Sequence, residues 1–237
     1  MNAPEAHRIA AVPLRGARLD LEPLRLDHAA ELAQALADHA LHAFIGGTPL
    51  PEPELSARYR RLLAGSPDPG TSWCNWTLRL RAGADGSAGT VGVGGTAGPV
   101  AGTAGTTTGA RGATGTTGAT TGARGATGTT TGARGTTGTT GTATAVTTTG
   151  PAVGTVQATV TSDGAEVAWV VGTPWQGHGL AREAAVVLTD WLRERGVPRL
   201  VAHVHPEHHA SAAVATAAGL APTEVFHERE RRWEWRR

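Results

Sequence analysis

The order of apolar and polar residues predicts regular secondary structure in two stretches of the chain, 14–82 and 151–237. In the first stretch, alternation predicts two strands, and apolar spacings of three and four residues predict two helices between them. The expected elements are a strand at 17–21, a helix capped by Asp27, a helix entered at Pro53 and a strand at 76–80.

The second stretch carries the stronger patterns. The expected elements are strands at 153–160, 166–171 and 200–204, helices ending near Arg195 and at 211–218, and a closing hairpin at 225–235. Some of these strands are joined by a tight turn and others by a helix. Hairpins pair strands antiparallel and crossover helices pair them parallel, so the sequence predicts an α/β fold with a mixed sheet.

Between the two stretches, residues 83–150 consist almost only of Gly, Thr and Ala, and the segment 107–117 recurs at 120–130. So few large apolar side chains cannot offset the entropy of ordering the chain, and we expect a disordered low-complexity insert. A Thr-rich β-solenoid is the alternative, but it requires a constant repeat length, whereas Arg111, Arg124 and Arg134 are unevenly spaced.

Composition excludes several classes of protein. The formal net charge is +1, which gives no basic field for nucleic acid. A single cysteine, Cys74, rules out an internal disulfide and fits a reducing compartment. Residues 1–13 lack the apolar region of a signal peptide and are expected to form a mobile tail. With no long apolar run, we expect a cytoplasmic protein that does not enter a membrane.

The segment 175–184 joins a glycine turn to the start of a helix, directly after an apolar strand. The first amides of a helix have no internal partners, and the helix dipole adds positive potential, so such a turn binds anions through the backbone. The segment lacks the lysine of a P-loop and the third glycine of a dinucleotide fingerprint. We therefore expect a phosphorylated ligand bound mainly by main-chain N–H groups.

Gln176, Gly179 and Ala181 match the Gln/Arg-x-x-Gly-x-Gly/Ala pattern, and the segment resembles the acetyl-CoA loop of the GCN5-related N-acetyltransferases, the GNAT family. Residues 205–211 resemble the ribosomal-protein alanine N-acetyltransferase branch (RimJ/RimL type), although His208 stands where that branch usually has asparagine. The resemblance implies a GNAT-like acyl-CoA N-acyltransferase fold with a long insert between two strands. The domain would then consist of 14–82 and 151–237.

The resemblance also implies acetyl-CoA as the co-substrate. Its pantetheine is expected along the central strand and its diphosphate at the glycine turn. The expected binding residues are Trp169, Val170, Val171, Gln176, Gly177, His178, Gly179, Leu180, Ala181, Arg182 and His208.

Three residues are candidates for the proton transfers of the reaction. Glu166, at the start of the central strand, resembles the general base of many family members, and His203 is the second choice. Ser211 matches the serine placed to protonate the departing thiolate. Each has a structural alternative, namely a solvated carboxylate, a satisfied sheet histidine and a helix cap. Glu228 and Glu230 on the closing hairpin are further candidates for the base.

The expected function is therefore an N-acetyltransferase that moves an acetyl group directly to a primary amine, on a protein N-terminus or a small molecule. A non-catalytic acyl-CoA-binding module and a Thr-rich surface or interaction protein are the alternatives. We expect a monomer or homodimer. The histidines within 203–209 lack the cysteine or second cluster that would complete a tetrahedral site, so no metal is expected.

Overall fold

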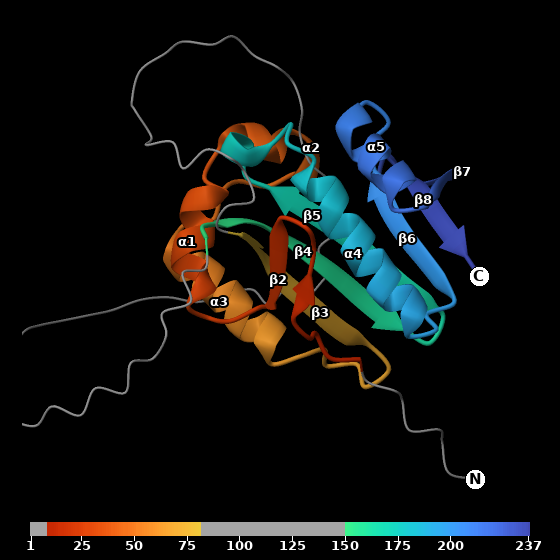
Figure 1. The fold of residues 1–237 in the computed structure, drawn as a ribbon, viewed down its shortest axis with the longest axis horizontal. Helices are drawn as coiled ribbons and strands as arrows, with labels where there is room; N and C mark the ends of the chain where they lie inside the picture. The colour runs from red at the N-terminus through yellow and green to blue at the C-terminus, as the bar shows by residue number, and fades with distance from the viewer. Residues whose placement is uncertain (1–8, 82–149) are drawn as a thin grey trace, which may run out of the picture. The chain divides into compact units, whose positions relative to one another are not determined.

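The computed structural model describes residues 9–81 and 150–237, which form one mixed sheet with helices on both faces (Figure 1). The strand order is β1-β2-β3-β4-β5-β6-β8-β7. The strands are β1 (Leu14–Arg15), β2 (Leu19–Pro23), β3 (Ser72–Leu80), β4 (Ala152–Thr161), β5 (Gly164–Val171), β6 (Arg199–Val204), β7 (Ala221–His227) and β8 (Glu230–Arg236). The helices are α1 (His28–Ala35), η1 (His39–Leu41), α2 (His42–Ile45), α3 (Glu52–Leu63), η2 (Thr173–Trp175), α4 (Leu180–Glu194) and α5 (His209–Ala217).

Alternating side chains give the sheet two different faces. The face toward α4 and α5 is the larger core, in which Trp76 of β3 meets Trp191 of α4 edge to face at 5.2 Å between ring centroids. The opposite face carries α1 and α3, packed through a smaller cluster that includes Leu32, Leu55 and Tyr59. The central strands therefore contact a helix on each side, and Figure 1 shows α4 lying along β5.

The predicted mixed α/β fold is confirmed, with the strands and long helices in the expected order. The sequence pattern did not predict the short elements β1, η1, α2 and η2, which are too brief to show a hydrophobic period. The last long helix also begins two residues before the expected Ser211.

The expectation of a mobile tail over 1–13 does not hold for residues 9–12. The main chain at Ile9 donates to Ser72 Oγ at 3.2 Å, and the Cys74 thiol donates to the Ile9 carbonyl at 3.2 Å. The Trp76 indole donates to the carbonyl of Val12 at 2.7 Å. These bonds hold the segment against β3, while residues 1–8 lie outside the described residues.

The predicted insert also lies outside the described residues, apart from its last residue, but the structure describes both of its ends. β3 and β4 pair antiparallel, and the amide of Leu80 donates to the carbonyl of Pro151 at 3.1 Å. Arg79, which is buried, binds both oxygens of Glu31 on α1, at 2.5 and 3.0 Å. Leu80 and Pro151, which stand on either side of the insert in the sequence, therefore lie side by side at the end of the β3–β4 pair.

No helix in the described part of the chain is long and apolar enough to cross a membrane.

Candidate functional site

The central feature of the site is the separation of β5 from β6. β5 pairs with β4 along its whole length, from Gly164 to Val171. Its parallel ladder to β6 is limited to Ala165↔Leu200 and Glu166↔Val201. Within the described residues, the rest of the β5 edge toward β6 therefore has no strand partner, and we call this stretch the gap.

Two main-chain amides face this gap. The amide of Gly172 donates to the Val153 carbonyl of β4 at 2.8 Å, and successive residues of a strand direct their main-chain groups to opposite edges. The amides of Trp169 and Val171 consequently face β6, whereas the amide of Val170 faces β4. An N–H group beside a reacting carbonyl is the donor that a developing oxyanion requires.

The glycine turn after β5 depends on two left-handed residues. Gly177 has φ +77° and Gly179, the N-cap of α4, has φ +75°, and L side chains rarely adopt such values. The cap makes no side-chain hydrogen bond, and at this end the Glu183 amide donates to the Gly179 carbonyl at 3.1 Å. The amides of Leu180, Ala181 and Arg182 are thus available to an anion.

Side chains from both sides hold the turn in place. The Gln176 side-chain amide donates to the Val171 carbonyl at 2.9 Å, which closes the end of β5. The Arg18 guanidinium of the β1–β2 connection donates to the His178 carbonyl at 2.7 Å and to Glu183 Oε2 at 2.9 Å. These hydrogen bonds therefore fix the conformation of the turn without a ligand.

A cleft of about 270 Å³ opens between the turn, the end of β5 and α5, and we call it the α4 cleft. Most of the predicted binding residues line it. The lining residues are Val171, Trp175, Gln176, Gly177, Gly179, Leu180, Ala181, Arg182, Ala210, Ala213 and Val214.

Four residues predicted to bind acetyl-CoA are not among the lining residues of the α4 cleft. His178 is exposed on the turn, and its carbonyl is engaged by Arg18. Trp169 is buried in the core with its amide at the gap. Val170 lies on the opposite face of the sheet, and His208 is buried at the start of α5.

The structure assigns the helix cap of α5 to His208 and not to Ser211. His208 Nδ1 accepts from the Ser211 amide at 3.0 Å, and its ring meets Phe44 edge to face at 4.4 Å between centroids. Burial lowers the pKa of His208 to about 4, so the ring is neutral and Nδ1 accepts. Ser211 is fully buried, and its Oγ has no hydrogen-bond partner among the described residues. The alternative reading of Ser211 as a helix cap is wrong.

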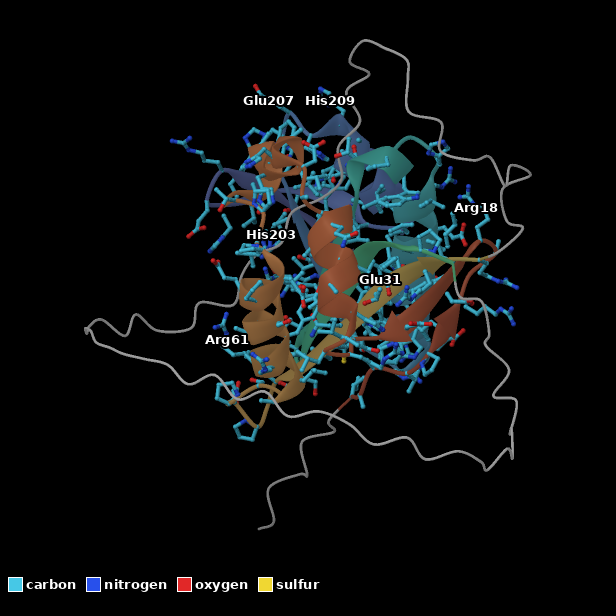
Figure 2. The ribbon with its side chains drawn as sticks, turned by 90° about the vertical axis from the view of Figure 1, so that its left-hand side faces the viewer. Arg18, Glu31, Arg61, His203, Glu207 and His209 are labelled. Atoms are coloured by element: carbon cyan, nitrogen blue, oxygen red, sulfur yellow. The ribbon has the colours of Figure 1, made fainter. Side chains whose placement is uncertain are left out.

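The structure brings the other two catalytic candidates together. His203 Nδ1 of β6 lies 3.5 Å from Glu166 Oε1 of β5, just where the two strands separate. Both side chains are on the sheet face of α1 and α3, and Figure 2 labels His203 in the view onto that side. The ring of His227, on the closing hairpin, lies 5.6 Å from that of His203. Among the described residues, no cluster of three His, Cys, Asp or Glu could hold a metal.

A second hollow, of about 100 Å³, lies under α1 and α3, and we call it the α3 cavity. Its floor includes Thr155 and Gln157 of β4 and Val170 of β5. Val170 thus lines the α3 cavity while its neighbour Val171 lines the α4 cleft. The two hollows approach β5 from opposite faces, next to the gap.

The sequence patterns missed several residues of this site, among them Arg18, Tyr59 and Gln157. Alternation in β4 could have placed Thr155, Gln157 and Thr159 on one polar face, because all three are half-buried between buried neighbours. No local sequence signal connects Arg18 with the glycine turn or Tyr59 with the α3 cavity, because each residue reaches its place only through the tertiary fold.

Comparison with known proteins agrees with this geometry. Residues 129–221 match the family model described as "Acetyltransferase (GNAT) domain". The α4 cleft, α5 and the separated strands all lie within the described part of that match, 150–221. A comparison with curated protein sequences found no match.

Solved structures show the same fold at low sequence identity. An acetyltransferase from Agrobacterium tumefaciens is 17% identical with a TM-score of 0.56, over 99% of this chain and 100% of that one. A GNAT-family acetyltransferase from Bacillus anthracis is 13% identical with a TM-score of 0.57, over 95% and 98%.

A third similar structure is RimL, a ribosomal-protein alpha-N-acetyltransferase in complex with coenzyme A. It is 10% identical with a TM-score of 0.56, over 95% of this chain and 98% of that one. The described residues therefore have the fold of these acetyltransferases, and residues 129–221 match the GNAT acetyltransferase family model.

Proposed function

We propose that this GNAT domain transfers an acetyl group from acetyl-CoA directly to a primary amine. The observation that carries the proposal is the position of two adjacent residues, Val171 in the α4 cleft and Val170 in the α3 cavity. This arrangement supports a thioester that reaches the gap between β5 and β6 from one face and an amine that reaches it from the other.

The α4 cleft supports binding of the CoA half of the donor. The amides of Leu180, Ala181 and Arg182 are the expected partners of the diphosphate, because they lack helical partners at the positive end of α4. The pantetheine would take the place of a strand beside β5, where the amides of Trp169 and Val171 face the gap. One of these amides would donate to the oxyanion that forms on the thioester carbonyl.

In the proposed reaction, the amine nitrogen forms a bond to the carbonyl carbon and the carbon–sulfur bond breaks. The amine must lose a proton, and the departing thiolate must gain one. Glu166 is the proposed final acceptor of the amine proton, and His203 at 3.5 Å is placed to share it. Val170 lies four positions after Glu166 along the strand, roughly 13 Å away, so the proton would travel through water along the polar face of β4.

Ser211 stays our candidate for protonating the thiolate, with His208 as the residue that positions it through the Ser211 amide. The absence of a hydrogen-bond partner for Ser211 Oγ within the described residues supports this role. The proposal retains the expectations of a cytoplasmic reaction and of catalysis without a metal.

The test is release of free CoA thiol when the full-length protein is mixed with acetyl-CoA and a panel of primary amines. Gly179→Trp should abolish binding of acetyl-CoA in calorimetry, because a side chain there would stand over the available amides. Gly196→Trp is the matched control, since Gly196 also has a positive φ, +75°, but lies at the other end of α4. Tight binding by the Gly179 variant, or binding by the wild type without turnover of any amine, would refute the proposal.

A further inference from the structure

The walls of the α3 cavity are aliphatic. Its volume of about 100 Å³ is several times the roughly 10–15 Å³ that one water needs. Leucines from α1, η1, α3 and the neighbouring loops form a large part of the wall, namely Leu24, Leu32, Leu36, Leu41, Leu50, Leu55 and Leu62. An apolar group of moderate size complements such a space, and a hydrated polar chain does not.

The charge of the cavity has one sign. Its lining includes Arg58 and His42, and within the described residues it contains no Asp or Glu. Arg58 is half-buried on α3, and no ion pair joins it to any described residue. A ligand carboxylate would find a guanidinium there, whereas a second cationic group of a ligand would find no counter-charge.

Three polar side chains of the cavity lining, those of Tyr59, Asn75 and Gln157, make no hydrogen bond to the described residues. The Tyr59 side chain is 4% exposed and its hydroxyl bonds to none of the described residues. Burial raises the pKa of Tyr59, so the phenol keeps its proton and can donate. Asn75 and Gln157 face one another across β3 and β4, and both are half-buried in the cavity lining. These three side chains line the cavity, so a ligand there can exchange hydrogen bonds with them.

We propose that the amine acceptor is a free amino acid with an aliphatic side chain. The side chain occupies the leucine-lined part of the α3 cavity, the carboxylate pairs with Arg58, and the α-amino group reaches the gap beside Val170. The inference rests on the proposed function and specifies its second substrate. It places amines with several positive charges, and amines without a carboxylate, among the poor acceptors.

The experiment compares L-leucine, L-leucinamide, a leucyl peptide and spermidine as acceptors for the full-length protein, by release of CoA thiol. We expect kcat/KM for L-leucine to exceed that for each of the others at least tenfold. Arg58→Gln should lower kcat/KM for L-leucine by about ten- to a hundredfold and leave the value for L-leucinamide unchanged. Arg58→Lys should lower kcat/KM for L-leucine less than Arg58→Gln does, because lysine keeps the positive charge but lacks the planar guanidinium group.

Arg61→Gln is the matched control, because Arg61 is exposed three residues further along the same helix (Figure 2). Calorimetry with CoA alone, on every variant, reports whether the fold and the donor site are intact. If spermidine, the amide or the peptide is acetylated as well as L-leucine, the inference fails while the proposed function stands. If CoA binds and neither these four amines nor any amine of the wider panel is acetylated, the proposed function fails and the inference with it.

Discussion

The carboxylate of Glu183 accepts hydrogen bonds from three groups at the start of β2, two of them on Arg18 and one on Leu19. Its Oε1 accepts from the amide of Arg18 at 2.6 Å and from the amide of Leu19 at 3.1 Å, and its Oε2 accepts from the Arg18 guanidinium at 2.9 Å. Gly16 lies so close that an added Cβ would stand 2.5 Å from Glu183 Oε1. One side chain in the first turn of α4 thus joins the glycine turn to the N-terminal half of the domain.

Replacing Glu183 should lower both the stability of the protein and its affinity for CoA. In Glu183→Ala, two main-chain amides lose a charged acceptor, and we expect the free energy of unfolding to fall by about 1–3 kcal/mol. Urea denaturation measures the change, and calorimetry with CoA should show weaker binding. The control is Glu194→Ala, at the exposed far end of α4. Equal stability of the two variants would contradict the proposal that Glu183 holds the start of α4 to the start of β2.

Gly154 allows β4 and β5 to lie close together at the gap. A Cβ at this position would stand 2.1 Å from the Val170 carbonyl oxygen and 2.9 Å from Val171 Cα. Gly154→Ala should therefore displace the end of β5 and lower the free energy of unfolding by about 1–3 kcal/mol, together with CoA affinity. Thr159→Val, at a half-buried position of the same strand, should change either quantity little. Unaltered CoA binding by the Gly154 variant would argue against the placement of the gap.

Glu166 and His203 should affect turnover more than binding. Glu166→Gln is expected to lower kcat by roughly 10²–10⁴, the usual contribution of a general base, while CoA affinity stays near that of the wild type. His203→Gln should cause a smaller loss of kcat, because His203 acts through its contact with Glu166. The control is Glu207→Gln, an exposed acid just after β6 that Figure 2 labels. A Glu166 variant with wild-type kcat at every pH would exclude this residue as the base.

The buried cap at His208 should make stability depend on pH. The unfolded chain takes up a proton at His208 below its ordinary pKa of 6.5, whereas the folded chain takes one up only below about 4. The free energy of unfolding therefore falls as the pH falls through this interval, by about 2–3 kcal/mol between pH 7.5 and pH 4.5, and levels off below it.

His208→Asn separates this effect from the other histidines. Asparagine retains an oxygen that can accept from the Ser211 amide, but it does not titrate. Denaturation of both proteins across the interval should show the variant losing about 2–3 kcal/mol less than the wild type toward acid. Parallel curves would mean that His208 is solvated in the folded protein.

Much of the fold could be predicted because its signals are local. The apolar periods of α3 and α4 lie within single elements, and Gly196 and Gly219, both with positive φ, follow the ends of α4 and α5 where the sequence predicted them to stop. The glycine turn was predicted for the same reason, since its two left-handed residues and the helix that follows are contiguous.

The parts that were missed depend on contacts between distant segments. His208 caps α5 although histidine is not a usual cap residue, because burial against Phe44 keeps the ring neutral and able to accept. Glu166 meets His203 only through the register of two parallel strands, and Tyr59 reaches the α3 cavity only because α3 packs on the sheet. Such relationships follow from pairing and packing, for which a single sequence carries no direct signal.

The hairpin position at Leu80 and Pro151 has a practical consequence. The ladder from Ser72↔Val160 to Arg79↔Ala152 sets the register of β3 and β4, and the entropy cost of the connection rises only slowly with its length. A fluorescent protein or an affinity tag could therefore be inserted here, because the inserted segment would begin at the end of the β3–β4 hairpin.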